Sequence, residues 1–325
     1  MSSPVFTMSE VLRARARIAP YLPATPAFYF PALDALFGCR VWLKFENHQP
    51  TGAFKVRGGV NLCAVLREEE GRDVSLLAAS TGNHGQSVAY GARLFGMRAR
   101  IVVPEQANPD KVAAMRALGA EVVFAGSNYE ECKSHAETMA QESGVRYISA
   151  GNEPLLIPGV ATYALELMER APELDAVFVP IGGGSGASGC CLAGHAINPA
   201  LKVIGVQSSH APAVYQSWKS GQPQTTSSAD TFAEGLATLS AFELTLDFLR
   251  AQLEDFILVD DQQLRSAIRL LYHHTHNVAE GAGAAALAAA WANREKFQGK
   301  SIGVIISGGN LPAGMLAEIL RENEA

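Results

Sequence analysis

One lysine, Lys55, stands in a segment whose residue types suit covalent chemistry on a carbonyl group. The segment is "TGAFKVRGG" (51–59), in which Lys55 follows the aromatic Phe54 and precedes an arginine and a pair of glycines. A lysine amine becomes a nucleophile when its neutral form is accessible and faces an electrophilic carbonyl. Taken alone, the segment also suits an ordinary solvated lysine, so the reactive interpretation depends on partners elsewhere in the chain.

A glycine-rich turn, "GGGSGASG" (182–189), follows a predicted strand and opens a predicted helix. Backbone N–H groups in that position suit a phosphate. The Gly-Lys-Ser/Thr ending of a nucleotide P-loop is missing. A dinucleotide fingerprint matches as Gly184-x-Gly186-x-x-Gly189, but Gln207 stands where its acidic residue is expected. Two other interpretations also remain open: a small phosphorylated cofactor held by backbone amides, and a plain tight turn.

Two further segments carry polar groups at predicted strand ends. "ASTGNHGQ" (79–86) places hydroxyl, amide and imidazole groups where a helix begins, and these could hold a carboxylate. An ordinary helix cap made by Ser80 or Thr81 is the alternative. "IISGGN" (305–310) ends the last predicted strand with Ser307 and two glycines, which by themselves are more typical of a turn.

Pyridoxal phosphate is a cofactor whose chemical demands Lys55, the glycine turn and Phe54 would meet. Its aldehyde is an electrophile for Lys55, its phosphate suits the glycine turn, and its flat ring needs an apolar surface such as Phe54.

The histidines of "HHTH" (273–276) have no cysteine or acid at metal-ligand spacing, so we expect a partly exposed helix face there.

Short apolar runs alternate with helical patterns along most of the chain, which predicts an α/β fold with parallel sheets covered by helices. The predicted strands lie at 74–80, 99–104, 121–126, 146–149, 176–181, 202–207, 255–260 and 301–307. A chain of 325 residues is long enough for two such lobes. Ligands are expected at the carboxyl ends of the strands.

Composition excludes several classes of partner. The formal net charge of −6 argues against nucleic acid, and the most apolar run, 281–292, is too short for a bilayer and predicts a buried helix.

Residues 7–10, "TMSE", form a capping box for a helix near the start of the chain. Five cysteines without metal spacing indicate reduced, buried thiols of a cytoplasmic protein.

These motifs, in this order, resemble the fold-type II pyridoxal-phosphate enzymes of the tryptophan synthase β superfamily, in particular the threonine/serine dehydratase and serine racemase branch. The resemblance spans nearly the whole chain. Lysine followed by x-Arg-Gly distinguishes this branch from cysteine synthases, which carry Lys-Asp-Arg. The resemblance implies two domains, each with an open, mostly parallel sheet flanked by helices: a large cofactor-binding domain (1–70 and 149–325) and a small inserted one (71–148).

The resemblance also implies a role for each motif residue. Lys55 would bind the cofactor aldehyde covalently, Phe54 would pack on the ring, and Asn83 would contact the ring hydroxyl. Ser307 would face the pyridine nitrogen, and Glu280 matches an acidic position near the ring. The phosphate would lie on Gly182, Gly183, Gly184, Ser185 and Gly186. The substrate carboxylate would lie on Ser80, Thr81, Gly82, Asn83 and His84.

The implied reaction is the removal of water from a β-hydroxy α-amino acid, which gives a 2-oxo acid and ammonia. A neutral serine leaves the pyridine nitrogen unprotonated, which favours expulsion of a β-hydroxyl over transamination, with Lys55 as general base. L-threonine and L-serine are the expected substrates, and a bulkier one such as phenylserine stays open. An amino-acid racemase is the alternative on the same fold, and an NAD-dependent dehydrogenase is a remote one.

Some positions depart from the branch pattern. Thr81 stands where serine racemases place a catalytic serine hydroxyl, which makes racemisation less secure. Gln207, Ala211 and Ala213 replace the acids of the racemase metal site, so we expect no metal there. Ala53 and "AEGLA" (233–237) replace other residues and are expected to alter the substrate pocket. The chain ends soon after Ser307, so we expect no regulatory domain and a catabolic role. By analogy we expect a homo-oligomer, a dimer or tetramer.

Overall fold

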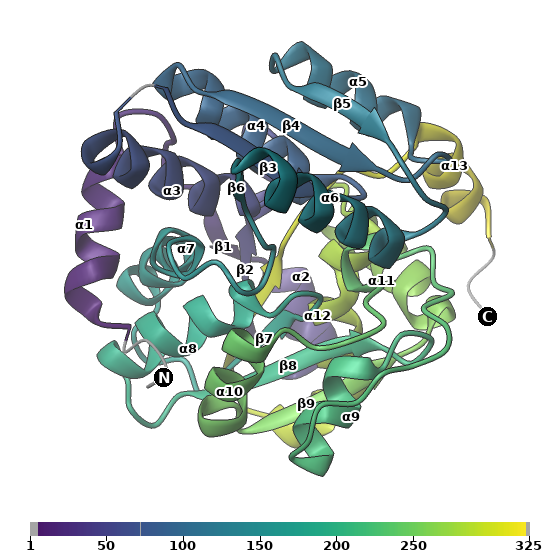
Figure 1. Ribbon diagram of the computed structural model, residues 1–325. Helices are drawn as coiled ribbons and strands as arrows, with labels where there is room; N and C mark the ends of the chain where they lie inside the picture. The colour runs from purple at the N-terminus through teal and green to yellow at the C-terminus, as the bar shows by residue number, and fades with distance from the viewer. Residues whose placement is uncertain (1–5, 72, 323–325) are drawn as a thin grey trace.

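The computed structural model describes residues 6–71 and 73–322 and divides its strands between two sheets (Figure 1). The first is six-stranded, in the order β1-β2-β10-β7-β8-β9. All its neighbouring strands are parallel except the edge strand β1, which is antiparallel to β2. Its strands are β1 (Ala27–Tyr29), β2 (Arg40–Phe45), β7 (Ala176–Pro180), β8 (Lys202–Ser208), β9 (Asp255–Val259) and β10 (Ser301–Ile306).

The second sheet is four-stranded and wholly parallel, in the order β5-β4-β3-β6. Its strands are β3 (Ser75–Ala79), β4 (Arg98–Val103), β5 (Glu121–Phe124) and β6 (Arg146–Tyr147). All of them lie within the segment 71–148 that the sequence assigns to a small domain; the boundaries themselves stay a prediction. The fold class expected from the sequence, two mostly parallel sheets flanked by helices, is confirmed.

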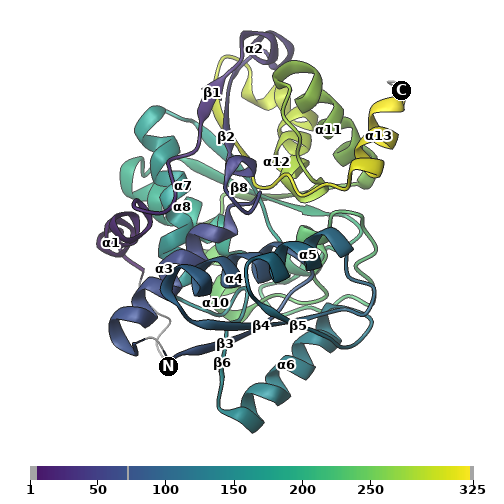
Figure 2. The ribbon, with the colours of Figure 1, turned by 90° about the horizontal axis from the view of Figure 1, so that it is seen from above.

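Helices cover both faces of each sheet. Figure 2 shows α4 and α5 on one face of the four-stranded sheet and α6 on the other. The six-stranded sheet packs α12 and α2 on one face and α7 and α8 on the opposite one. The helices are α1 (Met8–Ile18), α2 (Pro31–Phe37), α3 (Lys55–Glu69), α4 (Asn83–Phe95), α5 (Pro109–Ala117), α6 (Tyr129–Ser143), α7 (Leu156–Arg170), α8 (Ser185–Ile197), α9 (Ala213–Ser220), α10 (Glu243–Gln252), α11 (Asp261–Thr275), α12 (Gly281–Ala292) and α13 (Ala313–Arg321), with 3-10 helices η1 (Glu46–His48), η2 (Glu234–Leu236) and η3 (Arg294–Phe297).

The larger core follows from the alternation of side chains along the strands. In β7, Ala176 and Phe178 enter the core beneath α12, whereas Val177 and Val179 enter the core beneath α7 and α8. A strand covered on both faces is apolar throughout, which is why its sequence reads as an unbroken apolar run.

The sequence patterns predicted most elements correctly. All eight expected strands are present, the capping box of Thr7 and Glu10 opens α1, and 281–292 forms the buried helix α12. The five cysteines are free and buried. His273 is exposed on α11, as expected, but His276 lies just past the end of that helix. Within 6–71 and 73–322, no helix has the length and apolarity needed to cross a membrane.

Strands β1 and β2 were missed. β1 has only three residues, and β2 ("RVWLKF") carries Arg40 and Lys44, which interrupt the apolar pattern of a buried strand. Lys44 is nevertheless fully buried, because Glu166 accepts a hydrogen bond from its amine. Charge compensation by a residue 122 positions away is not visible in the local sequence.

A buried ionic cluster fixes the start of α3. Arg57, two residues after Lys55, is only 1% exposed. Its guanidinium donates to Glu46 (Nε–Oε2 2.7 Å) in η1 and to Glu166 (Nη1–Oε1 2.6 Å) in α7. With Lys44, the cluster holds two cations and two carboxylates, so its charges balance. It therefore ties the first turn of α3 to β2 and α7.

We predict that Arg57→Leu lowers the free energy of unfolding by about 3–5 kcal/mol, because Glu46 stays buried without its ion-pair partner. Urea unfolding, followed by circular dichroism, measures the loss. The matched control is Arg15→Leu, which removes an exposed ion pair with Glu169 (2.6 Å) and should cost less than about 1 kcal/mol. Equal losses in the two variants would contradict a special role for the buried cluster.

Candidate active site

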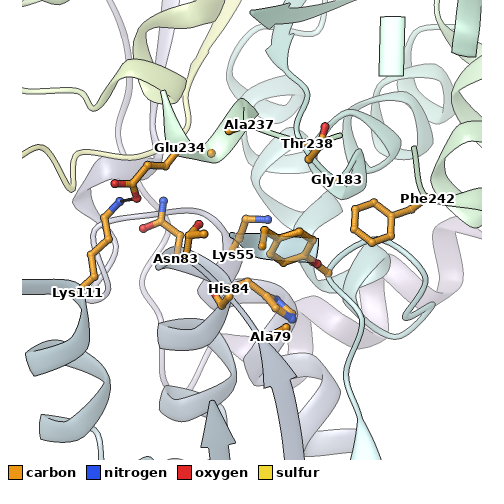
Figure 3. Close-up of a pocket in the computed structure, with 15 residues that line it drawn as sticks. Lys55, Ala79, Asn83, His84, Lys111, Gly183, Glu234, Ala237, Thr238 and Phe242 are labelled. Carbon is orange, nitrogen blue, oxygen red and sulfur yellow. Dashed lines mark hydrogen bonds and ion pairs between the residues drawn. The ribbon is translucent and has the colours of Figure 1, made fainter. Parts of the chain in front are cut away.

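The motif residues gather where the carboxyl ends of strands from both sheets meet. Lys55 follows β2 and η1, the 80–84 loop follows β3, the glycine turn follows β7, and Ser307 follows β10. Glu280 precedes α12 as its cap residue. Figure 3 shows Lys55 near the centre of the pocket, with Asn83 and His84 on one side and Gly183 and Phe242 on another.

Lys55 is held by backbone contacts to the end of β10. Phe54 N donates to Ser307 O (3.0 Å), and Ala53 forms an isolated antiparallel bridge with Gly308. Lys55 is the first residue of α3, and its carbonyl accepts a hydrogen bond from Ser87 Oγ (2.5 Å) in α4. The side chain is therefore fixed at its base by both halves of the molecule.

Lys55 lies where two cavities meet, because it lines both. Burial lowers the pKa of its amine to about 8, although the Glu280 carboxylate acts in the opposite direction. Its Nζ lies 5.5 Å from the centre of the Phe54 ring. A lowered pKa raises the fraction of neutral amine near neutral pH, which is what a nucleophile or general base requires.

The glycine turn has the form expected of an anion cradle at the start of α8. Gly184 caps the helix with φ of 89°, which favours glycine. A Cβ at Gly182 would lie 2.0 Å from Gly235 O, so a side chain there would displace the neighbouring loop. Among the described residues, the backbone amides of 182–186 donate to no acceptor. Unpaired amides at a helix N-terminus suit a phosphate.

The smaller cavity, about 380 Å³, lies between this cradle and Lys55. Phe54, Asn83, Glu280 and Ser307 also line it. Asn83 is oriented by two contacts: its Nδ2 donates to Glu280 Oε1 (2.5 Å), and its Oδ1 accepts from Asn310 (2.8 Å). Burial raises the pKa of the Glu280 carboxyl, whereas Lys111 and the Asn83 hydrogen bond act to lower it.

The larger cavity, about 560 Å³, lies on the other side of Lys55 and is lined by Ser80, Thr81, Asn83 and His84. Ser80 Oγ accepts from the amides of Gly82 (2.9 Å) and Gly85 (2.8 Å), so its oxygen is used within the loop as a helix-capping group. The cap alternative considered for this motif therefore applies to Ser80. Thr81 lines the cavity and, within the described chain, has no side-chain partner.

His84 is neutral at physiological pH. Burial, followed by the nearby Lys55 charge, lowers its pKa to about 4. Its Nε2 contacts the carbonyl of Ile148 (3.1 Å), and because a carbonyl only accepts, Nε2 carries the proton. The imidazole is thereby a fixed, uncharged wall of the larger cavity.

Several lining residues were missed from the sequence. Lys111, Tyr129, Thr238 and Phe242 line the larger cavity, yet they lie outside the motifs that the sequence analysis singled out. Glu234, Gly235 and Ala237 also line it, as expected for "AEGLA". Ala53 lines neither of the two cavities and is buried against Gly308, so its effect on the substrate pocket stays a prediction.

Gln207, which replaces an acid of the racemase metal site, has a structural role. Its Nε2 donates to Thr238 Oγ1 (3.3 Å) and its Oε1 accepts from Tyr215 N (3.0 Å). It thus supports Thr238, a wall of the larger cavity. In the part of the chain that the structure describes, no group of three potential metal ligands is present.

Comparison with known families decides the assignment. Residues 18–308 match the family described as pyridoxal-phosphate dependent enzyme. The chain belongs to that family. Its cofactor is accordingly pyridoxal phosphate, and the dinucleotide alternative for the glycine turn is wrong.

Individual relatives agree with the family match. L-threonine ammonia-lyase of Thermotoga maritima is 35% identical over 98% of this chain and 79% of its own. L-threo-3-hydroxyaspartate ammonia-lyase of Saccharomyces cerevisiae is 34% identical over 98% and 97%. The solved structure of maize serine racemase has a TM-score of 0.90 at 33% identity and covers 96% of both chains. The ammonia-lyase relatives assign this family member to the pyridoxal-phosphate-dependent lyases.

The residues present fit the cofactor. The amides of 182–186 have no acceptor among the described residues and would hold its phosphate, and the neutral amine of Lys55 would bind its aldehyde. Phe54 packs edge-on against Tyr163 (5.9 Å between ring centres), which fixes an apolar surface for a flat ring beside Gly186.

We predict that cofactor-free protein binds pyridoxal phosphate covalently at a rate that rises with pH and levels off above about 8, because only neutral Lys55 reacts. Stopped-flow visible absorbance after mixing measures this rate across neutral and alkaline pH. Lys55→Ala is the control and should give no such change in visible absorbance. A rate that levels off only near 10.5, the ordinary lysine pKa, would contradict the lowered pKa.

Proposed function

We propose that this lyase is a dehydratase that converts L-threonine or L-serine into the corresponding 2-oxo acid and ammonia. The observation that carries the proposal is the position of Lys55. Its low-pKa amine lies where a phosphate cradle and a polar helix-start loop face each other across two adjoining cavities. A base held between a cofactor site and a carboxylate site is the arrangement that removal of a Cα proton requires.

The 80–84 loop would bind the substrate carboxylate. Asn83 and His84 are the first residues of α4, so their backbone amides are free of intrahelical acceptors and lie at the positive end of the helix dipole. Because His84 is neutral, binding there would rest on amides and hydroxyls rather than on a fixed cation. The Cα proton of a substrate oriented in this way would pass to Lys55 Nζ.

Ser307 supports elimination over transamination. When bound, pyridoxal phosphate supplies an electron-withdrawing ring that stabilises negative charge at the substrate Cα. Ser307 lines the cofactor-side cavity and its Oγ donates to Ala282 O (3.4 Å), so the residue proposed to face the pyridine nitrogen is neutral. A neutral partner keeps the ring a weaker electron sink, and the charge at Cα is relieved by loss of the β-hydroxyl.

The charges around the larger cavity favour a substrate with a neutral β-substituent. Apart from Lys55, its described cationic lining residue is Lys111, which is paired with Glu234 (2.6 Å). His84 is neutral. A second substrate carboxylate, as in 3-hydroxyaspartate, would therefore be desolvated without a free cationic partner. The short side chains of Ala79, Ala150 and Ala237 leave space there.

Racemisation is the second candidate function. Thr81 lines the larger cavity with its hydroxyl uncommitted to other described side chains, which suits a proton donor to Cα. We propose it as a side activity of the dehydratase.

Two features of the protein's setting are also proposals. Five free, buried thiols support a cytoplasmic location. Phe28 and Tyr29, which are half exposed on the edge strand β1, support association into a homo-oligomer.

We predict that the purified holoenzyme releases 2-oxo acid and ammonia from L-threonine and L-serine. The kcat/KM for these substrates should be at least about tenfold higher than for threo-3-hydroxyaspartate, because burying an unpaired carboxylate costs more than about 1.4 kcal/mol. A panel including phenylserine is measured by 2-oxo acid detection, with Lys55→Ala as the inactive control. Chiral analysis of the recovered substrate separates racemisation from elimination. No turnover across the panel would refute the dehydratase, and a preference for hydroxyaspartate would refute the charge argument.

A further inference from the structure

Lys111 separates the larger cavity from a second cleft. It lies in the first turn of α5, which Asn108 caps by accepting hydrogen bonds from the Asp110 and Lys111 amides. Although lysines are seldom buried, Lys111 is only 7% exposed. It lines both the pocket beside Lys55 and a cleft of about 470 Å³ between α5 and the 309–312 segment. Its side chain is therefore part of the wall between them.

The amine of Lys111 joins the two sheets across this wall. Figure 3 shows the side chain extending from its helix to Glu234, and the two charged groups are 2.6 Å apart. The amine is also 3.8 Å from Glu280 Oε2. Lys111 belongs to a helix of the four-stranded sheet, whereas η2 and α12, which carry the two carboxylates, pack in the core of the six-stranded sheet.

The stem of Lys111 covers the loop proposed to bind the substrate carboxylate. A Cβ built on Gly82 would lie 2.5 Å from Lys111 Cδ, so the lysine stem occupies the space that a side chain at 82 would need. This contact explains the glycine in "STGNH" by close approach. One side chain thus contacts the carboxylate loop with its stem and the opposite half of the pocket with its amine.

The charge balance shows why a cation is needed at this place. The charged and polar groups that act on Glu280 are Lys111 from α5, Glu234 from η2, Lys55 from α3 and Asn83 from α4. Two carboxylates thus approach one another beside Asn83, and Lys111 is the cation in contact with both. Without it, the two carboxylates would repel each other and separate.

We propose that Lys111 is a positioning residue, which holds the 80–84 loop against the six-stranded half through Glu234 and Glu280 and so closes this side of the substrate pocket. The consequence for substrate binding rests on the proposed function, whereas the link between the two halves does not. A partly buried pair that joins two sheets differs from an exposed pair on one element, which contributes little.

The test compares substrate binding in matched variants of the holoenzyme. L-alanine, which has no β-hydroxyl to lose, is titrated while the visible absorbance of the cofactor is recorded. We expect Lys111→Met to weaken L-alanine binding about tenfold. Glu234→Gln should weaken it less, because Glu280 remains as a partner for Lys111. Lys111→Arg keeps the charge and should restore most of the affinity. Lys202→Met removes an exposed pair with Glu254 (2.9 Å) and should change nothing. Unchanged affinity in Lys111→Met would overturn the role in substrate binding.

Hydrogen–deuterium exchange of the same proteins tests the link independently of any substrate. Backbone amides of 79–86 should exchange faster in Lys111→Met than in the wild type, Lys111→Arg or Lys202→Met. Exchange equal to wild type in Lys111→Met would overturn the proposal. If the wild type gives no response to L-alanine and no turnover, the proposed function fails, and the exchange result alone then decides whether Lys111 holds the loop.

Discussion

The active site depends on three adjacent strands of the six-stranded sheet and on the backbone contacts between the segments that follow them. β10 lies between β2 and β7, so the lysine segment after β2, Ser307 after β10 and the glycine turn after β7 emerge side by side. Phe54 N donates to Ser307 O (3.0 Å), and Gly309 N donates to Gly52 O (2.8 Å). These bonds fix the base of Lys55 relative to the end of β10, beside the glycine turn, without any side chain being involved.

The four-stranded sheet reaches the same site through close packing of α3 and α4. A Cβ at Gly59 would lie 2.3 Å from Ser87 O, and one at Gly91 would lie 2.5 Å from Gly59 O. The second glycine of "KVRGG" is therefore explained by the approach of α4, which carries Asn83 and His84 at its start. Ser87 reinforces the contact by donating to the Lys55 carbonyl (2.5 Å). Lys55 and the proposed carboxylate loop are held together by this helix pair.

Electrostatics around Lys55 follow a consistent pattern in which most buried charges are paired. Arg57 and Lys44 neutralise Glu46 and Glu166 behind the lysine, and the single cation Lys111 lies between Glu234 and Glu280 beside it. Lys55 itself has no carboxylate within ion-pair distance among the described residues, so burial outweighs the attraction of Glu280 and its pKa falls to about 8. The same pairing leaves the pocket without a free cation for a second substrate carboxylate.

The sequence by itself predicted the fold class and the cofactor correctly, because strand–helix alternation and the spacing of glycines express local constraints, and it proposed Lys55 as the reactive lysine. A helix start whose backbone amides suit a phosphate needs close approach of the backbone, and the glycines of "GGGSGASG" allow it. Only the tertiary structure decided the rest. Ser80 is occupied as a helix cap and Ala53 lines neither cavity, although both belong to recognisable motifs. Lys111 and Glu234, 123 residues apart, meet at the pocket because two sheets bring their strand ends together, and no local pattern encodes a contact that depends on the packing of distant elements.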